Sequence, residues 1–156
     1  MTEQTFMQRA VTLSLEKMRA NSGGPFGAVI VRNGTIISEG WNEVTSRNDP
    51  TAHSEIVAIR RACTVLGTFN LPDCDIYTSC EPCPMCLGAI YWARLGRVYF
   101  ANTRIDASKI GFDDDFIYRE VAKAPELRKI PHSQRTTEDA QVAFEEWAAS
   151  PDKIRY

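Results

Sequence analysis

Apolar side chains recur at helical spacing near the start of the chain, where Phe6, Ala10 and Leu13 face one side and the polar Arg9 and Glu16 face the other. Such a stripe is typical of an amphipathic helix, so we expect one over residues 6–18. The pattern then changes to short runs of β-branched residues. The sequence therefore predicts that strands follow the first helix.

Two of these runs predict a hairpin. Val29-Ile30-Val31 and Ile36-Ile37 flank Asn33-Gly34, a dipeptide that favours a two-residue type I′ turn. After Asp49-Pro50-Thr51, which offers a cap and a proline suited to a first helical turn, apolar residues follow helical spacing as far as Gly67. We expect a second helix there.

The next elements continue the alternation of helix and strand. We expect a strand at residues 75–78, a third helix from 84 to about 93, and a strand at 98–100. This order indicates helices packed on a mixed sheet. Beyond residue 102 the pattern weakens, with a last helix expected from Glu138 to Ala149. No repeat or long linker divides the chain, so we expect one domain over residues 1–156.

The length of the chain indicates that its cysteines are not needed as disulfides. A chain of 156 residues buries roughly 70% of the surface of its unfolded form, so it can build a core without disulfides. Its five cysteines all fall between residues 63 and 86. This placement favours reduced thiols or metal ligands over a disulfide framework.

Charge and hydropathy argue against two classes of partner. Residues 1–19 lack the layout of a secretion signal, and no apolar run approaches the roughly 20 residues that cross a bilayer, so we expect a cytoplasmic protein without a membrane partner. The 18 Lys and Arg against 20 Asp and Glu give a net charge of -2, with no basic run. This balance disfavours a nucleic acid as partner.

One histidine and two cysteines form the strongest chemical pattern in the chain. His53 lies at one expected helix start, and Cys83 and Cys86 lie at the next. Imidazole and thiolate are good zinc ligands, and cysteines three apart share one helical face. The positive end of that helix favours the thiolate form. Three protein ligands leave one tetrahedral position open, as in catalytic zinc sites.

A carboxylate belongs to the same pattern. Glu55 follows His53 by two positions, so both side chains can face one ion only at the mouth of the helix. Zinc lowers the pKa of its bound water to about 7, which supplies hydroxide at neutral pH. We expect Glu55 to take up the released proton and pass it on.

Other interpretations use the same residues differently. His53 can be an ordinary helix-start histidine and the cysteines core residues, although the joint pattern disfavours this. Cys80, Cys83 and Cys86 can also be part of an iron–sulfur run, against which the intervening prolines argue. With Cys80 as fourth ligand, the zinc site would be closed and the chain a structural module without catalysis, in which Glu55 has no purpose.

The motifs resemble those of a known superfamily. The pattern H-x-E at residues 53–55, followed by P-C-x-x-C at 82–86, is the signature of zinc-dependent nucleobase deaminases. Within that superfamily of cytidine and nucleoside deaminases, the chain resembles the bacterial guanine deaminases over nearly its whole length. The resemblance is carried by residues 23–31, 48–53, 78–94 and 111–114.

The four blocks differ in what they identify. Residues 78–94 also resemble tRNA adenosine deaminases and cytidylate deaminases, so they identify the chemistry better than the substrate. Gly111-Phe112-Asp113-Asp114 discriminates the guanine enzymes. Ser54 departs from the family, in which alanine is commoner between the histidine and the glutamate. Because a small residue still fits, we expect little change in ligand geometry.

The resemblance implies a fold and a reaction. The fold is an α/β fold of three layers, α-β-α, around a central mixed sheet of five strands. The reaction is hydrolysis of guanine to xanthine and ammonia, with one zinc ion per chain and zinc-bound hydroxide attacking the carbon that carries the amine. Glu55 would deliver the proton to the ring nitrogen, and Asp114 would assist as a second carboxylate near the amine.

The resemblance also implies a group of substrate-binding residues. Phe26 would stack on the purine ring, and Asn42 would hydrogen-bond its polar edge. The further candidates are Ala52, Trp92, Phe112 and Tyr156. Judged from the residues alone, Phe26 also suits core packing and Asn42 a turn, Trp92 suits a core or a subunit interface, and the acidic residues 113–115 suit a solvated turn or helix cap.

The family resemblance extends to assembly. Members are homodimers that can exchange a C-terminal segment, here about residues 137–156, so that Tyr156 would close over the partner's active site. An ordinary frayed chain end is the alternative. The rival reaction is deamination of tRNA adenosine, which requires basic contacts to phosphates that this sequence does not concentrate anywhere.

Overall fold

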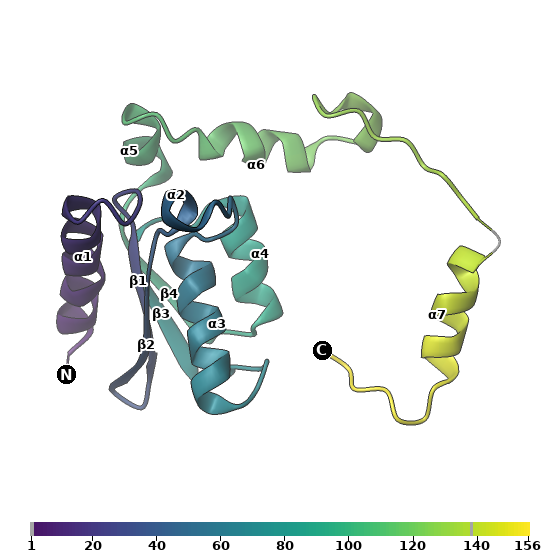
Figure 1. The fold of residues 1–156 in the computed structure, drawn as a ribbon, viewed down its shortest axis with the longest axis horizontal. Coiled ribbons are helices and arrows are strands. Elements are labelled where there is room, and N and C mark those ends of the chain that lie inside the picture. The colour runs from purple at the N-terminus through teal and green to yellow at the C-terminus, as the bar shows by residue number, and fades with distance from the viewer. Residues whose placement is uncertain (1, 138) are drawn as a thin grey trace. The chain divides into compact units, whose positions relative to one another are not determined.

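The computed structural model describes residues 2–137 and 139–156, which form two compact units, one ending at Tyr118 and one from Arg119 to Tyr156. The first unit is built on a mixed sheet, visible in Figure 1. Its strands are β1 (Gly27–Arg32), β2 (Thr35–Trp41), β3 (Cys74–Cys80) and β4 (Arg97–Asn102). They lie in the order β2-β1-β3-β4, with β1 antiparallel to β2 and β3, and β4 parallel to β3.

The expectation of five strands was wrong for the part of the chain that the structure describes, where the sheet has four. The residues after β4 begin a helix instead. Thr103 and Asp106 form a capping box, in which the Thr103 side chain accepts from the Asp106 N–H and the Asp106 carboxylate accepts from the Thr103 N–H. This cap starts α5 (Arg104–Lys109), and α6 (Asp114–Ala122) follows.

The predicted hairpin between β1 and β2 is confirmed. Asn33 and Gly34 both have positive φ, 50° and 73°, as a type I′ turn requires. The register pairs Gly27 with Trp41 and Arg32 with Thr35, with an irregularity between Ile30 and Val31. The turn therefore fixes which residues of β1 face each side of the sheet.

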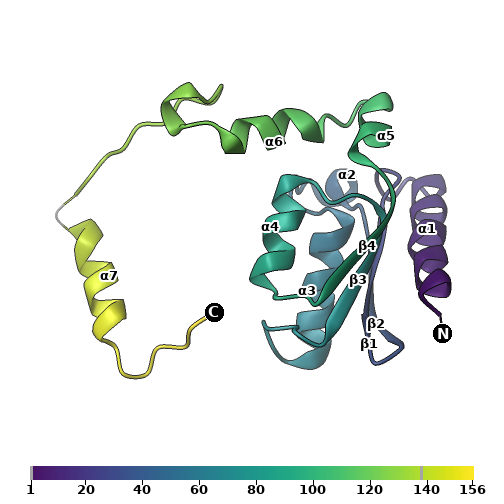
Figure 2. The same cartoon turned by 180° about the vertical axis from the view of Figure 1, so that it is seen from behind.

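Helices cover both faces of the sheet, so the three-layer arrangement is confirmed. Helix α1 (Glu3–Arg19) packs on one face, and α3 (Ser54–Leu66) and α4 (Pro84–Trp92) pack on the other (Figures 1 and 2). Successive residues of β1 point to opposite faces, and Ala28 and Ile30 meet α3 and α4 while Val29 meets α1. Both faces of this central strand are buried.

The hydrophobic core holds α3 and α4 against the sheet. On the α1 face, Phe6 packs against Tyr77 with ring centroids 5.3 Å apart. On the other face, Ala58 and Ala62 of α3 and Ile90 of α4 pack into one cluster with β1 and β3. Burial of each large apolar side chain stabilises the fold by roughly 1.5–3 kcal/mol. This packing therefore keeps the starts of α3 and α4 in place.

The second unit, from Arg119, contains the end of α6, a 3-10 turn at Pro125–Leu127 and α7 (Asp139–Ala149). The predicted last helix is confirmed over these described residues, while its expected first residue, Glu138, lies outside them. Several large apolar side chains of this unit are exposed: Val142, Phe144, Trp147, Ile154 and Tyr156. In the part of the chain that the structure describes, no helix is both long and apolar enough to span a membrane.

Strand β2 approaches α3 closely at Gly40. A Cβ atom there would overlap the carbonyl oxygen of Ser54 and lie 2.5 Å from the Ala58 nitrogen. Gly40→Ala should therefore lower the free energy of unfolding by about 3 kcal/mol, as forcing a group into a packed interior does. Gly88→Ala, at an exposed position of α4 with open space around it, should instead raise that free energy by up to about 1 kcal/mol.

Denaturant unfolding followed by circular dichroism would measure both changes against the native chain. Equal stability of Gly40→Ala and the native protein would contradict the close packing of β2 on the first turn of α3.

Candidate functional site

Three potential metal ligands meet where α3 and α4 begin. His53 is the N-cap of α3, Cys83 is the N-cap of α4, and Cys86 lies in the first turn of α4. His53 Nδ1 lies 3.6 Å from Cys83 Sγ and 3.5 Å from Cys86 Sγ. All three ligand atoms lie within 4.8 Å of one another. The predicted ligands are thus brought together by the two helix starts.

The distances fit a tetrahedral zinc ion. With Zn–S near 2.3 Å and Zn–N near 2.0–2.1 Å, a nitrogen and a sulfur on adjacent tetrahedral corners lie about 3.6 Å apart. The two observed separations, 3.5 and 3.6 Å, match this value. Both cysteines are buried and His53 is half-buried, so the donors are shielded from water. Imidazole with two thiolates is a donor group that suits zinc.

The two thiols have opposite pKa shifts. The nearby Cys86 and His53 side chains lower the pKa of Cys83 to about 4. The contact with Cys83 and burial raise the pKa of Cys86. The contact with Cys83 also raises the pKa of His53. A divalent ion binds the thiolate form, so its affinity would depend on pH.

Glu55 lies beside the ligands and is buried, with 6% of its surface exposed. It is in the first turn of α3, so its position at the helix mouth is confirmed. The helix begins later than expected, because Asp49 accepts from the Thr51 N–H and hydroxyl in the preceding loop and does not cap α3. Burial raises the pKa of Glu55, which favours the protonated carboxyl group and suits a residue that takes up and releases a proton.

A cavity connects these groups. It is lined by Phe26, Asn42, His53, Glu55, Cys80, Glu81, Cys83, Phe112 and Asp114. Asp113 caps α6 by accepting from the Phe116 N–H at 3.0 Å, whereas Asp114 is half-buried and faces the cavity. Burial raises the pKa of Asp114. One acidic cluster thus supplies both a helix cap and a second carboxyl group for the site.

Two aromatic rings form the apolar wall of the cavity. The rings of Phe26 and Phe112 meet edge to face, with centroids 4.8 Å apart and planes at 88°. Gly24 leaves space beside them, since a Cβ there would contact both rings. A flat, uncharged ring such as a purine is suited to a wall of this kind.

Asn42 is oriented by the backbone. Its side-chain oxygen accepts from the N–H groups of Gly24 and Val44, each at 3.2 Å. The carbonyl end is therefore occupied, and the amide nitrogen remains as the donor for the cavity. Any hydrogen bond from the Asn42 side chain to a molecule in the cavity would therefore be donated by this nitrogen.

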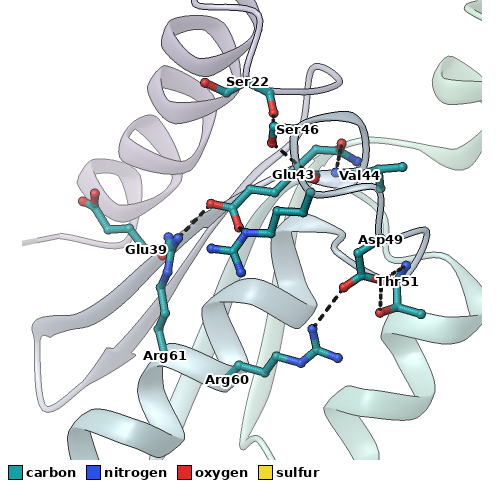
Figure 3. Close-up of polar contacts among 11 residues, drawn as sticks. Ser22, Glu39, Glu43, Val44, Ser46, Asp49, Thr51, Arg60 and Arg61 are labelled. Atoms are coloured by element: carbon teal, nitrogen blue, oxygen red, sulfur yellow. Dashed lines mark hydrogen bonds and ion pairs between the residues drawn. The ribbon is translucent and has the colours of Figure 1, made fainter.

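A buried carboxylate stabilises the short turn between β2 and α2 (Val44–Arg47), which carries Asn42. Glu43 follows it and is 5% exposed. Figure 3 shows Arg61 reaching this turn, where its guanidinium lies 2.9 Å from Glu43 Oε1 and donates to the Glu39 carbonyl at 2.8 Å. Arg47 of α2 lies 2.7 Å from Glu43 Oε2. These contacts tie the end of β2 to α2 and α3.

Sequence patterns did not identify Glu43 or Glu81, and they named Cys80 only as a possible metal or cluster ligand. An isolated Glu gives no periodic signal, and Arg61, the partner of Glu43 on α3, is 18 residues away. Cys80 ends β3, Glu81 follows it, and both line the cavity just before the P-C-x-x-C motif. The Glu81 carboxylate accepts from the Arg104 N–H at 2.9 Å, which joins the α5 start to the site.

Two of the predicted substrate-binding residues, Ala52 and Trp92, are not among the residues that line the cavity. Ala52 is buried and accepts through its carbonyl from the Glu43 N–H, so it supports the loop before His53. Trp92 ends α4, eight residues beyond Pro84 and thus about 12 Å along the helix, and is 66% exposed. Tyr156 belongs to the second unit.

These features define a class of protein. The sequence model of the cytidine and deoxycytidylate deaminase zinc-binding region matches residues 1–102, and the chain belongs to this family. His53, Cys83 and Cys86 are the residues that would hold its zinc ion.

Comparisons with individual proteins give closer matches than the family model. The chain is 55% identical over 156 residues to guanine deaminase of Bacillus subtilis, with 100% of both chains aligned. The X-ray structure of that enzyme superposes with a TM-score of 0.97, covering 100% of this chain and 99% of the other. A tRNA-specific adenosine deaminase of Agrobacterium fabrum is 42% identical over 98 residues, 60% of this chain and 64% of that one. The guanine deaminase structure from Nitrosomonas europaea has a TM-score of 0.69 at 32% identity, covering 72% of this chain and 65% of the other.

The cysteines should differ in reactivity in the zinc-free protein. Cys80 and Cys83 both line the cavity, but burial raises the pKa of Cys80 to about 11, whereas the pKa of Cys83 is lowered to about 4. At pH 7 Cys83 is therefore a thiolate and Cys80 a thiol. Iodoacetamide with peptide mass mapping should label Cys83 first from pH 5 to 8, and zinc should protect it. Labelling of Cys80 before Cys83 would contradict the lowered pKa of Cys83.

Proposed function

We propose that the chain catalyses the zinc-dependent hydrolysis of guanine to xanthine and ammonia. The observation that supports this most directly is the cavity itself, in which Glu55 and Asp114 lie beside the His53, Cys83 and Cys86 cluster. The full-length similarity to a guanine deaminase supports the choice of substrate. The net charge of -2 fits a free base better than a tRNA.

The chemistry requires a water molecule to add to the carbon that carries the exocyclic amine, and ammonia to leave. Zinc, when bound, supplies the Lewis acidity that makes water a nucleophile at neutral pH. Glu55 accepts the proton from that water and delivers it to the adjacent ring nitrogen, since its raised pKa suits both steps. Asp114, also with a raised pKa, delivers a proton toward the departing amine.

The cavity walls orient the base. Phe26 and Phe112 cover the purine ring, and excluding water there strengthens the polar contacts. The Asn42 amide nitrogen donates to an acceptor on the edge of the base, because its oxygen is already bonded to the backbone. A purine with a carbonyl oxygen or an unprotonated ring nitrogen at that edge satisfies this donor.

We also propose that the protein is a cytoplasmic homodimer. Large apolar side chains are exposed in one part of the first unit, on α4, β4 and α5. They are Tyr91, Trp92, Phe100 and Ile105. Burial of such residues in a subunit interface would remove them from water, which fits the expected interface role of Trp92. All five cysteines are free, and thiols remain reduced in the cytoplasm.

The C-terminal segment, about residues 137–156, is proposed to be exchanged between the subunits. Its exposed Ile154 and Tyr156, 68% and 67% accessible, have the apolar surface of a segment that covers another site. In the proposed dimer Tyr156 closes the active site of the partner and limits access of bulk water.

Deletion of residues 151–156 tests this closure. The truncated, zinc-loaded chain should release ammonia from guanine several-fold more slowly, because the cavity stays open to water, while zinc per chain is unchanged. Metal content by atomic absorption is the control. A truncated chain with native turnover would leave the segment without a role in closure.

The substrate assignment is tested by ammonia release from guanine, guanosine, adenine, cytosine, cytidine and a tRNA anticodon hairpin, measured side by side with the zinc-loaded protein. Guanine should turn over preferentially. Turnover of the hairpin instead would support the zinc-dependent reaction but contradict guanine as the substrate. Inertness toward every compound, with zinc bound, would indicate a structural zinc module.

Glu55→Gln tests the proton transfer. The variant should keep its zinc but lose at least about 10²-fold in turnover, since the amide is isosteric and cannot carry the proton. Loss of zinc together with activity would make Glu55 a metal ligand and would contradict its proposed role.

A further inference from the structure

The carboxylate of Glu55 has a neighbour that the family motif does not require. The Ser54 hydroxyl donates to Glu55 Oε2 at 2.9 Å. Both residues are buried, with 0% and 6% of their surface exposed. A hydrogen bond to a carboxylate in such surroundings is strong, because water does not compete for either partner.

Packing of the surrounding backbone holds the main chain of Ser54 in place. Ser54 is the first residue of α3, and β2 crosses directly over that turn at Gly40, where no Cβ would fit against the Ser54 carbonyl oxygen. The Glu43 N–H bonds to the carbonyl of Ala52 at 2.9 Å, which holds the loop two residues earlier. Ser54 therefore cannot shift without displacing either β2 or the His53 loop.

The hydrogen bond from Ser54 restricts the carboxylate. The last torsion of a glutamate side chain has a broad, nearly twofold energy profile, so a carboxylate without a partner samples many orientations. The bond to Oε2 selects one orientation of the carboxylate, and Glu55 lines the cavity in that orientation. Ser54 is itself not among the residues that line the cavity, so it reaches the reaction only through Glu55.

We propose that Ser54 is a positioning residue that aligns the Glu55 carboxylate for proton transfer, an inference that rests on the proposed deamination. A group that acts through another residue improves the alignment of reacting atoms without adding a contact to the substrate. Its loss should therefore lower kcat and leave KM nearly unchanged.

Ser38 supplies a matched control. Its hydroxyl donates to the Ala58 carbonyl at 2.7 Å, and the residue is 7% exposed. Ser38→Ala thus removes a buried hydroxyl that also joins β2 to α3, but at a position that does not touch Glu55. Ser54→Ala should fold, because alanine fills the same space and favours a helix.

The experiment compares the native chain with Ser54→Ala, Glu55→Gln, the double variant and Ser38→Ala, all zinc-loaded and assayed by ammonia release from guanine. Ser54→Ala should lower kcat about tenfold, the effect of losing one hydrogen bond to a charged group, with KM within about twofold of native. The double variant should be no slower than Glu55→Gln, because the hydroxyl has no carboxylate left to align. Ser38→Ala should keep native kcat, and zinc per chain should be equal in all five.

Several results would overturn the inference. Native kcat in Ser54→Ala would show that the hydroxyl aligns nothing, and an equal loss in the Glu55→Gln background would show that it acts independently of the carboxylate. A loss of zinc in Ser54→Ala, or the same loss of kcat in Ser38→Ala, would assign the effect to structure.

Failure of the proposed function looks different from these results. If the native chain deaminates another base, the proposed substrate is wrong, and the five chains are compared by ammonia release from that base. A native chain that deaminates none would overturn the proposed function and this inference together.

Discussion

The close approach of two helix starts is the constraint on which the rest of the structure depends. One histidine and two cysteines must lie within 4.8 Å of one another, and each occupies a helix cap or first turn. Their closeness shifts the pKa of Cys83 down and that of Cys86 up. Packing of α3 and α4 on β1 and β3 keeps the ligands together, so the core contributes directly to the geometry of the metal site.

The same constraint determines the surroundings of the cavity. A carboxylate next to a metal ligand has to be buried, and Glu55 is accommodated by a hydroxyl donor and by a raised pKa. Asn42 also lines the cavity, and the residue that follows it, Glu43, pairs with Arg61 (Figure 3). Polar groups that would be costly to bury singly are thus each supplied with a partner.

The sequence predicted the parts of the site that depend on local spacing. The hairpin at Asn33-Gly34 follows from turn chemistry. Cys83 and Cys86 lie in one helix turn, and His53 lies at the start of another helix, so local spacing indicated these ligands. The number of strands was overestimated because it came from the family resemblance, while the capping box at Thr103 starts a helix after β4. Glu43 was missed because its role depends on contacts distant in sequence.

The central claim is that zinc is held by three protein ligands with a fourth position free for chemistry. X-ray absorption spectroscopy of the zinc-loaded protein measures this directly. The predicted spectrum has two sulfur neighbours near 2.3 Å and two lighter neighbours at about 2.0–2.1 Å, and is the same in Cys80→Ser. Three sulfur neighbours, reduced to two in Cys80→Ser, would show a closed structural site and would contradict the account.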